Sequence, residues 1–199
     1  IVLIDEQTGK EIENSNERGI LCAKPPLPPG ACTTIHNNDK RFVETYFKSI
    51  QNNLIYSTFD VATKDEEGYY YIQGRSDDII NVAAHRFGSR EIEECLQKSG
   101  LIIDCAVIGK KDELKGETIC AFVIVGEEKP NIKELLQNFV IKSIGKVAKP
   151  EIYVVDKLPK TRSGKLLRRA MKAICDNEPV GDTSTLEDST ALESIRNVL

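Results

Sequence analysis

Residues 79–155 alternate between short apolar runs and helical patterns, and this alternation constrains the fold more than any other feature of the sequence. Strands are predicted for four apolar runs, at 79–83, 103–108, 118–125 and 152–155. Between them, residues 89–99 and 131–140 place apolar side chains at helical spacing. The resulting order, β-α-β-β-α-β, is that of a split βαβ domain. We therefore expect an α+β fold with a small mixed sheet and flanking helices.

The first 76 residues have a different texture, because their apolar runs are separated by turns. Strands are expected at 1–4, 19–23, 54–58 and 69–72, and a short helix at 41–50. The proline-rich stretch 25–30 cannot hold regular structure, since proline lacks the backbone donor. The first residue is Ile1 rather than Met and already lies in an expected strand. We therefore expect the chain to begin inside a longer protein, with any targeting signal upstream.

The composition is that of a globular protein, with 40% hydrophobic and 29% charged residues among 199. The six cysteines form no C-x-x-C pair and there are two histidines, so we expect no metal site. Several cysteines lie inside apolar patterns, which indicates a reducing compartment: the cytoplasm, or alternatively the mitochondrial matrix. No apolar run approaches the roughly 18 residues of a membrane span, so we expect no membrane association.

Charge is distributed unevenly along the chain. The net charge of -4 argues against bulk nucleic-acid binding, yet residues 157–172 hold seven basic residues and no acid. This segment is not a Walker loop, which would need glycine where the chain has Pro159 and Ser or Thr where it has Leu166. Residues 176–199 carry six acids and one arginine, which predicts a loosely docked acidic tail.

Lys165 is the strongest candidate for chemistry within the basic segment. Pro159 stiffens its entry, and Gly164 lets the backbone turn just before an expected helix. A mobile lysine at that place suits a carboxylate or phosphate whose charge changes during a reaction. Composition alone also fits a solvated basic loop, or a nuclear-import or RNA patch.

A second polar segment, at 74–78, separates two apolar strands and has the composition of a hinge or an exposed turn. Charged residues in such turns are usually solvated. His85, which follows the next strand, is on its own a weak candidate for acid–base work, because most single histidines are structural.

Six motifs together carry a resemblance to a known family. They are YSTFD at 56–60, DEEGY at 65–69, GRSDD at 74–78, HR at 85–86, EIE at 91–93 and LPKTRSGKLLRR at 158–169. In this order and spacing, over nearly the whole chain, they resemble the AMP-forming short-chain acyl-CoA synthetases among the adenylate-forming enzymes. The similarity is greatest to acetyl-CoA and propionyl-CoA synthetases. Features that favour the propionate branch are Phe59 and the stretches 28–30, 41–46 and 88–94.

The resemblance implies a domain organisation. Residues 1–76 are expected to be the C-terminal end of a large nucleotide- and acyl-binding domain, and 77–175 a mobile C-terminal lid, followed by the acidic tail 176–199. The family's phosphate loop, adenine pocket and acyl pocket would lie upstream of this chain. The fold implied is α+β, a β-rich end of the large domain followed by the lid.

The resemblance also assigns roles around the nucleotide. Asp60 is expected to accept hydrogen bonds from both ribose hydroxyls, as an ionised carboxylate does well. Arg75 is its expected partner at the ribose. Arg86 is expected to face a nucleotide phosphate.

Three further positions match the parts of the family that move. Lys165 matches the lysine of the adenylation step, and Asp77 matches the hinge residue about which the lid rotates between half-reactions. Ala84 lies where the chain passes close to the pantetheine arm of CoA. Relatives usually have glycine there, so Ala84 departs from the pattern and puts the thioester step in question.

The implied activity is that of an acid–thiol ligase acting on propionate or acetate. Its substrates would be the short-chain carboxylate, ATP as Mg-ATP and CoA, with most of the ATP held by the large domain. A lysine acetyltransferase and deacetylase acting on Lys165 are the expected protein partners, because relatives are regulated by modification of this lysine. No nucleic acid is expected, and the isolated chain should be inactive.

One alternative from another class stays open. Split βαβ domains often bind RNA or protein without catalysis, and the basic segment 157–172 could serve such a ferredoxin-like module. Against this, the chain lacks the aromatic-rich strand of RNA-recognition domains and its net charge is negative.

Overall fold

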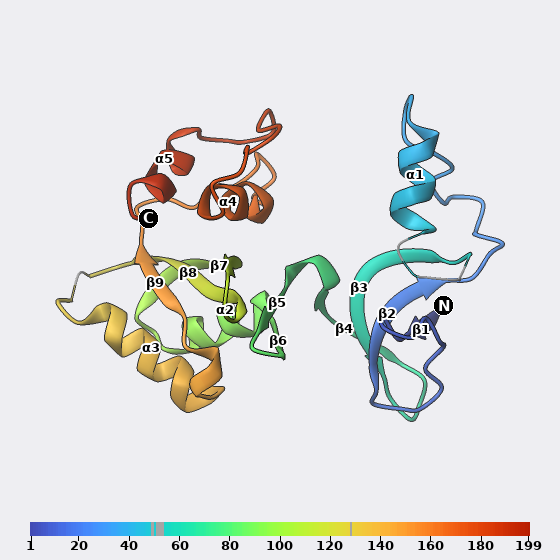
Figure 1. The fold of residues 1–199 in the computed structure, drawn as a ribbon, viewed down its shortest axis with the longest axis horizontal. Helices are drawn as coiled ribbons and strands as arrows, with labels where there is room; N and C mark the ends of the chain where they lie inside the picture. Colours follow the sequence, from blue (N-terminus) through green and yellow to red (C-terminus); the bar gives the residue numbers. More distant parts are fainter. Residues whose placement is uncertain (49, 51–53, 128) are drawn as a thin grey trace. The chain divides into compact units, whose positions relative to one another are not determined.

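The computed structural model describes residues 1–48, 50, 54–127 and 129–199. The chain divides into two compact units, Ile1–Asp77 and Asp78–Leu199. Each unit contains one β-sheet with helical elements packed on it (Figure 1).

The first unit is a four-stranded antiparallel sheet in the order β1-β2-β3-β4. Its strands are β1 (Val2–Ile4), β2 (Arg18–Ala23), β3 (Tyr56–Lys64) and β4 (Tyr70–Arg75). Leu3, Ile20 and Val61 from three of these strands are buried in its core. The pairing of β3 with β4 shifts register between Val61 and Ala62, directly after Asp60.

Helix α1 (Asp39–Tyr46) packs against β3 through aromatic rings. The Asn38 side chain caps it by accepting the Arg41 N–H, as an N-cap asparagine is expected to. Phe42 is buried, and the Tyr46 ring stacks on Tyr56 with centroids 5.1 Å apart. The helix ends earlier than the expected range 41–50, of which residue 49 lies outside the described residues.

The second unit contains a five-stranded sheet with β8 at its centre. The strands are β5 (Ile79–Val82), β6 (His85–Gly88), β7 (Ile102–Asp112), β8 (Gly116–Val125) and β9 (Glu151–Val154). The path is β6-β5-β8-β7, and β9 pairs with β8 in parallel. Two short 3₁₀ turns, η1 (Ser76–Asp78) and η2 (Lys146–Ala148), precede β5 and β9 respectively.

Strands β7 and β8 are buried on both faces, because side chains alternate across a strand and helices cover each side. One face carries Val107, Ala121 and Val123, which pack with α2 (Ser89–Lys98) and α3 (Ile132–Ser143). The other face carries Ile108 and Phe122, which pack with α4 (Arg168–Cys175) and α5 (Thr190–Arg196). Figure 1 shows α4 and α5 on one side of this sheet and α3 on the other.

The acidic segment 176–199 is part of the second unit's core rather than a loosely docked tail. Ala191, Leu192 and Ile195 on one side of α5 are buried, and two of them join the cluster around Phe122. Ahead of α5, the chain makes backbone contacts with residues 160–162. Because the segment is rich in acids, its sequence did not predict the short amphipathic helix α5.

The predicted α+β architecture is confirmed, with three local differences. The order of strands and helices follows the prediction, with one strand added, β6, which pairs with β5 as a hairpin. Helix α2 begins at Ser89, as expected, but ends at Lys98, one residue before the expected end. The strands predicted at 103–108 and 118–125 are longer, so they leave only a tight turn between them.

Candidate functional site

In the first unit, the structure places Asp60 and Arg75 opposite each other on β3 and β4. Arg75 Nη1 lies 3.8 Å from Asp60 Oδ1, and the guanidinium lies 5.8 Å from the centroid of the Phe59 ring. The Asp60 side chain is 30% exposed, so its oxygens are open to a ligand on one side. The two residues expected at the ribose therefore share one corner of the sheet.

Hydroxyl groups hold this corner in shape. The Thr58 hydroxyl donates to the Leu21 carbonyl at 2.8 Å and accepts the Asp60 N–H at 3.1 Å. The Ser57 hydroxyl accepts the N–H of Phe59, whose φ of 63° is left-handed. A bulky residue in this conformation is strained. The surrounding bonds stabilise a backbone turn that presents the Asp60 carboxylate.

Asp77 lies in the exposed 3₁₀ turn that closes the first unit. Its Oδ1 accepts a hydrogen bond of 2.8 Å from Arg75 Nε, and its Oδ2 one of 3.3 Å from Nη2. Arg75 thus contacts both the expected ribose carboxylate and the expected hinge residue. No buried side chain lies in this turn.

In the second unit, Ala83 and Ala84 form the two-residue turn of the β5–β6 hairpin, since Val82 pairs with His85. Both alanines have positive φ, 46° and 68°, as a type I′ turn requires. Both are exposed, as are His85 and Arg86 beside them. The hairpin therefore projects Ala84 and Arg86 from the surface on a turn that favours glycine.

Lys165 lies on a tight loop closed by backbone pairing. Lys160 pairs with Leu166, and the Thr161 N–H donates to the Lys165 carbonyl at 2.8 Å. Gly164 has a φ of 82°, and the Thr161 hydroxyl accepts the Lys165 N–H at 3.1 Å. Lys165 is exposed, and its ammonium forms no ion pair with any residue that the structure describes. The hydrogen-bonded backbone of this loop therefore holds the Lys165 ammonium group at the surface, without a carboxylate partner among the described residues.

Carboxylates neutralise much of the basic segment around this loop. Four of its seven cations form ion pairs: Lys157 with Asp188, Lys160 with Asp104, Arg168 with Glu93, and Lys172 with Glu117. In the described parts of the chain, Arg162, Lys165 and Arg169 form none. Phosphate backbones are bound by unpaired lysine and arginine side chains, so this pairing weakens the RNA-binding alternative.

The ion pairs shift pKa values in the expected sense. The hydrogen bond from Lys157, followed by those from Thr190, lowers the pKa of Asp188 to about 2.

Burial raises the pKa of Cys105 to about 12 and that of Cys175 to about 11. These buried thiols are therefore protonated at neutral pH, and they act as packing groups rather than nucleophiles.

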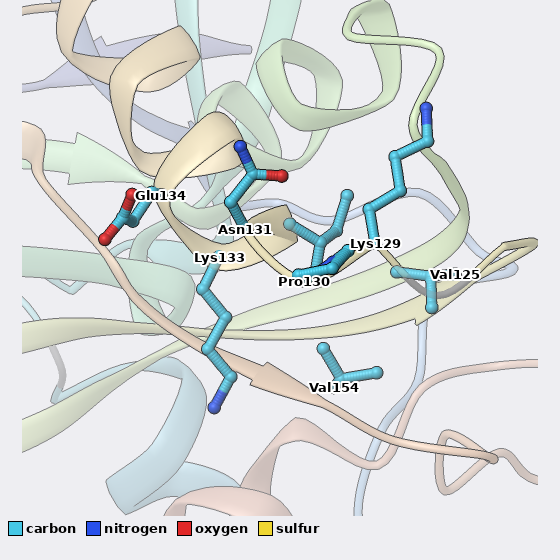
Figure 2. A pocket seen from close by; sticks show the side chains of 8 residues that line it. Val125, Lys129, Pro130, Asn131, Lys133, Glu134 and Val154 are labelled. Carbon is cyan, nitrogen blue, oxygen red and sulfur yellow. The ribbon is translucent and has the colours of Figure 1, made fainter.

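A surface pocket of about 640 Å³ lies apart from all of these residues, at the start of α3. Figure 2 shows Lys129, Lys133 and Asn131 around it. Val125, Pro130, Ile132, Glu134 and Val154 line the remainder. None of the sequence-predicted site residues contributes to its wall.

No group of three or more His, Cys, Asp or Glu side chains in the part of the chain that the structure describes is arranged to hold a metal ion. None of the described helices combines the length and apolar character needed to cross a membrane.

Comparisons with known proteins agree with this arrangement. Residues 91–165, which end at Lys165, match the AMP-binding enzyme C-terminal domain family. The whole chain aligns with 33% of the propionate–CoA ligase of Salmonella typhimurium, and the two sequences are 42% identical over the 212 aligned residues. The chain therefore contains an AMP-binding enzyme C-terminal domain, at residues 91–165. Its homologues include the acetyl-CoA synthetase of Cupriavidus necator, 41% identical over 97% of this chain and 30% of that protein. The chain thus spans about a third of these relatives.

Solved structures share the fold. The ATP-bound RpMatB-BxBclM chimera B1 has a TM-score of 0.72 at 25% identity, over 88% of this chain and 35% of its own. The amide bond synthetase McbA from Marinactinospora thermotolerans has a TM-score of 0.69 at 24% identity, over 87% of this chain and 34% of its own. The AMP-binding C-terminal fold predicted from the motifs is therefore confirmed.

Sequence reasoning missed the buried carboxylates of the second unit. Glu93 belongs to the EIE motif, but nothing in the sequence says that it faces inward to Arg168, 75 positions later. Glu117 accepts both the Asn81 N–H at 2.8 Å and the Lys172 ammonium at 2.5 Å. The one available signal was the spacing of Arg168 and Lys172, which puts both cations on one face of a helix.

Proposed function

We propose that this chain is the C-terminal part of an AMP-forming acyl-CoA synthetase that acts on propionate or acetate. In the first half-reaction a carboxylate oxygen attacks the α-phosphorus of ATP, which gives acyl-adenylate and releases pyrophosphate. In the second, the CoA sulfur attacks the acyl carbon, which gives acyl-CoA and releases AMP and a proton. The observation that carries the proposal is Lys165 itself, which ends the matched domain segment, is exposed and forms no ion pair within the described ranges.

Asp60 and Arg75 hold the ribose in this proposal. The partly exposed carboxylate of Asp60 accepts both ribose hydroxyls, because an ionised carboxylate has the required acceptor sites. Arg75 fixes that carboxylate from the neighbouring strand. Arg86, on the exposed hairpin, faces a phosphate of the nucleotide.

Lys165 acts in adenylation. Two anions, ATP and a carboxylate, must approach each other, and negative charge develops on the departing pyrophosphate. A lysine between them screens the repulsion and stabilises that charge. The loop geometry supports this role, because the backbone around Lys165 is closed by hydrogen bonds while the side chain is free of carboxylates.

The second half-reaction uses another part of the same unit. We infer that rotation about Asp77 withdraws Lys165 and presents the hairpin turn at Ala84 to the pantetheine arm. The exposure of this turn and the division of the chain between Asp77 and Asp78 support a pivot there. Ala84 adds one methyl group where the backbone must approach CoA closely.

Lys165 is also the proposed point of control. Acetylation by a lysine acetyltransferase would remove its charge, and a deacetylase would restore it. Because the ammonium is exposed, a modifying enzyme can reach it without unfolding the loop. Acetylation of Lys165, detected by mass spectrometry, should abolish adenylation. Deacetylation should restore it.

The direct test is a product assay on the full-length protein that carries this chain. Incubation with ATP, CoA and propionate or acetate should release AMP and pyrophosphate and form the acyl thioester. Release of ADP and phosphate, or RNA binding without any ligase activity, would contradict the proposal. Comparing kcat/KM for the two acids assigns the substrate.

A further inference from the structure

Arg168 lies three residues after Lys165, at the first position of α4, and is held by one buried and one half-buried carboxylate. Its Nη2 donates to Glu93 Oε1 and Oε2, each at 2.7 Å, and its Nη1 lies 3.8 Å from Asp78 Oδ2. The exposed fractions of the Arg168, Glu93 and Asp78 side chains are 25%, 11% and 28%. One guanidinium therefore contacts two separate acids inside the second unit.

These contacts join elements that are far apart in sequence. Asp78 is the first residue of the second unit and directly follows the proposed pivot. Glu93 belongs to α2 and also accepts the N–H of Val107, in the middle of β7, at 2.8 Å. The clasp, defined here as Asp78, Arg168 and Glu93, thus connects the pivot end, one helix and the central sheet to the start of α4.

The clasp is not explained by a contribution to the stability of the fold alone. Desolvating buried charges offsets most of their attraction, so apolar residues of similar size often stabilise a protein as well. A cation at the first position of a helix opposes the helix dipole, and the first turn of α4 contains no acid. In addition, Arg168 Nε is buried without a hydrogen-bond partner among the described residues. Local rules broken together at one residue indicate a functional reason.

The position of the clasp supplies that reason. Between Lys165 and Arg168 there are only two residues, and the second, Leu167, donates its N–H to the Pro159 carbonyl at 2.9 Å. The loop is therefore closed at its base, and its base is continuous with the helix that Arg168 fixes. A shift of α4 would carry Lys165 with it.

We propose that Arg168 is a positioning residue, which couples the loop of Lys165 to the pivot end of the second unit through Asp78 and Glu93. This inference rests on the proposed function. When the unit turns about Asp77, the clasp makes Lys165 follow Asp78 as part of one rigid body. Adenylation needs the ammonium in register with the reacting phosphate, whereas the thioester step does not use it.

The test compares both half-reactions in the full-length protein. Arg168→Gln should lower kcat of ATP–pyrophosphate exchange by roughly 10²-fold, the loss typical of a group displaced by about 1 Å. Formation of thioester from supplied acyl-adenylate should stay unchanged. Arg169→Gln is the matched control, because it removes one positive charge from the same helical turn without touching the clasp, and it should leave both rates unchanged.

Two more variants separate positioning from folding. Arg168→Lys keeps one charge but cannot bridge Glu93 and Asp78, so it should restore the melting temperature and still exchange slowly. Asp78→Asn weakens the 3.8 Å contact with Arg168 but leaves the Glu93 bonds, and should cause a smaller loss in the same half-reaction. Equal loss of both half-reactions in these folded variants, or exchange equal to that of Arg169→Gln, would overturn the positioning role.

Lys165→Ala in the same assay distinguishes this failure from failure of the proposed function. If Lys165→Ala abolishes exchange and Arg168→Gln does not lower it, only the positioning role is wrong. If Lys165→Ala exchanges normally, the proposed function itself is wrong.

Discussion

Single backbone conformations carry much of the proposed chemistry. Phe59, beside the proposed ribose-binding Asp60, and Ala84, at the hairpin turn, both adopt the left-handed region that favours glycine. Strain of this kind persists where the surrounding structure holds it, and it concentrates at functional sites.

Ala84→Gly should therefore stabilise the protein. A non-glycine residue in the left-handed region costs about 1–2 kcal/mol, and glycine adds about 0.4–1 kcal/mol of unfolded-state entropy, so the net gain is about 1 kcal/mol. Thermal or denaturant unfolding measures it. Ala121→Gly, in β8 without positive φ, is the control and should be destabilising. A lower unfolding free energy for Ala84→Gly would show that the turn is unstrained.

At the scale of helices and strands, apolar periodicity predicted the second unit well, because β7 and β8 are buried on both faces. The same signal failed for β6, whose residues His85 and Arg86 are exposed. It also failed for α5, because the acids of 176–199 outnumber the three buried apolar residues of the helix. Edge strands and short docked helices are stabilised by contacts with distant parts of the chain, which the local hydrophobic pattern does not reveal.

The candidate site also contains residues that the local sequence reveals and residues that it does not. Lys165, Asp60 and Arg75 belong to contiguous motifs and could be named from sequence. The pairing of Arg168 with Glu93 could not, because each charge alone is typical of a solvated helix face and only the tertiary structure brings the two side chains together.

Docking of α5 should depend on pH through Asp188. The Lys157 hydrogen bond lowers the pKa of this carboxyl to about 2 from an ordinary 3.8. A lowered folded pKa gives stability above the unfolded pKa, which is lost as pH falls through the folded one. Amide hydrogen-exchange protection in residues 190–196 should therefore fall between pH 4 and 2. In Asp188→Asn this pH dependence should flatten, whereas Glu187→Gln should keep it; an unchanged profile in Asp188→Asn would refute the coupling.

At the scale of the whole molecule, the proposed ribose-binding residues and Lys165 belong to two different units, which divide the chain between Asp77 and Asp78. Arg75 and Asp60 belong to the first unit, and Lys165 and the hairpin to the second. Such a division suits an enzyme that must rebuild its site between two half-reactions, because one rotation can exchange one set of groups for another.

Asp77→Pro tests the pivot. Proline fixes φ near -65° and restricts the preceding Ser76, so rotation should stop in one pose. One half-reaction should survive and the other should fall steeply, with the fold retained because the turn is exposed. Asp77→Ala, which loses the Arg75 contact but keeps φ free, should retain both. Near-normal rates for both half-reactions in the proline variant would place the pivot elsewhere.

The most direct test of the central claim is the half-reaction profile of Lys165→Ala in the full-length protein, beside Arg162→Ala. Arg162 lies on the same loop and, among the described residues, also forms no ion pair. Lys165→Ala should abolish ATP–pyrophosphate exchange and still form thioester from supplied acyl-adenylate, while Arg162→Ala keeps exchange. Exchange retained in Lys165→Ala, or equal loss of both half-reactions, would contradict the assignment of this lysine to adenylation.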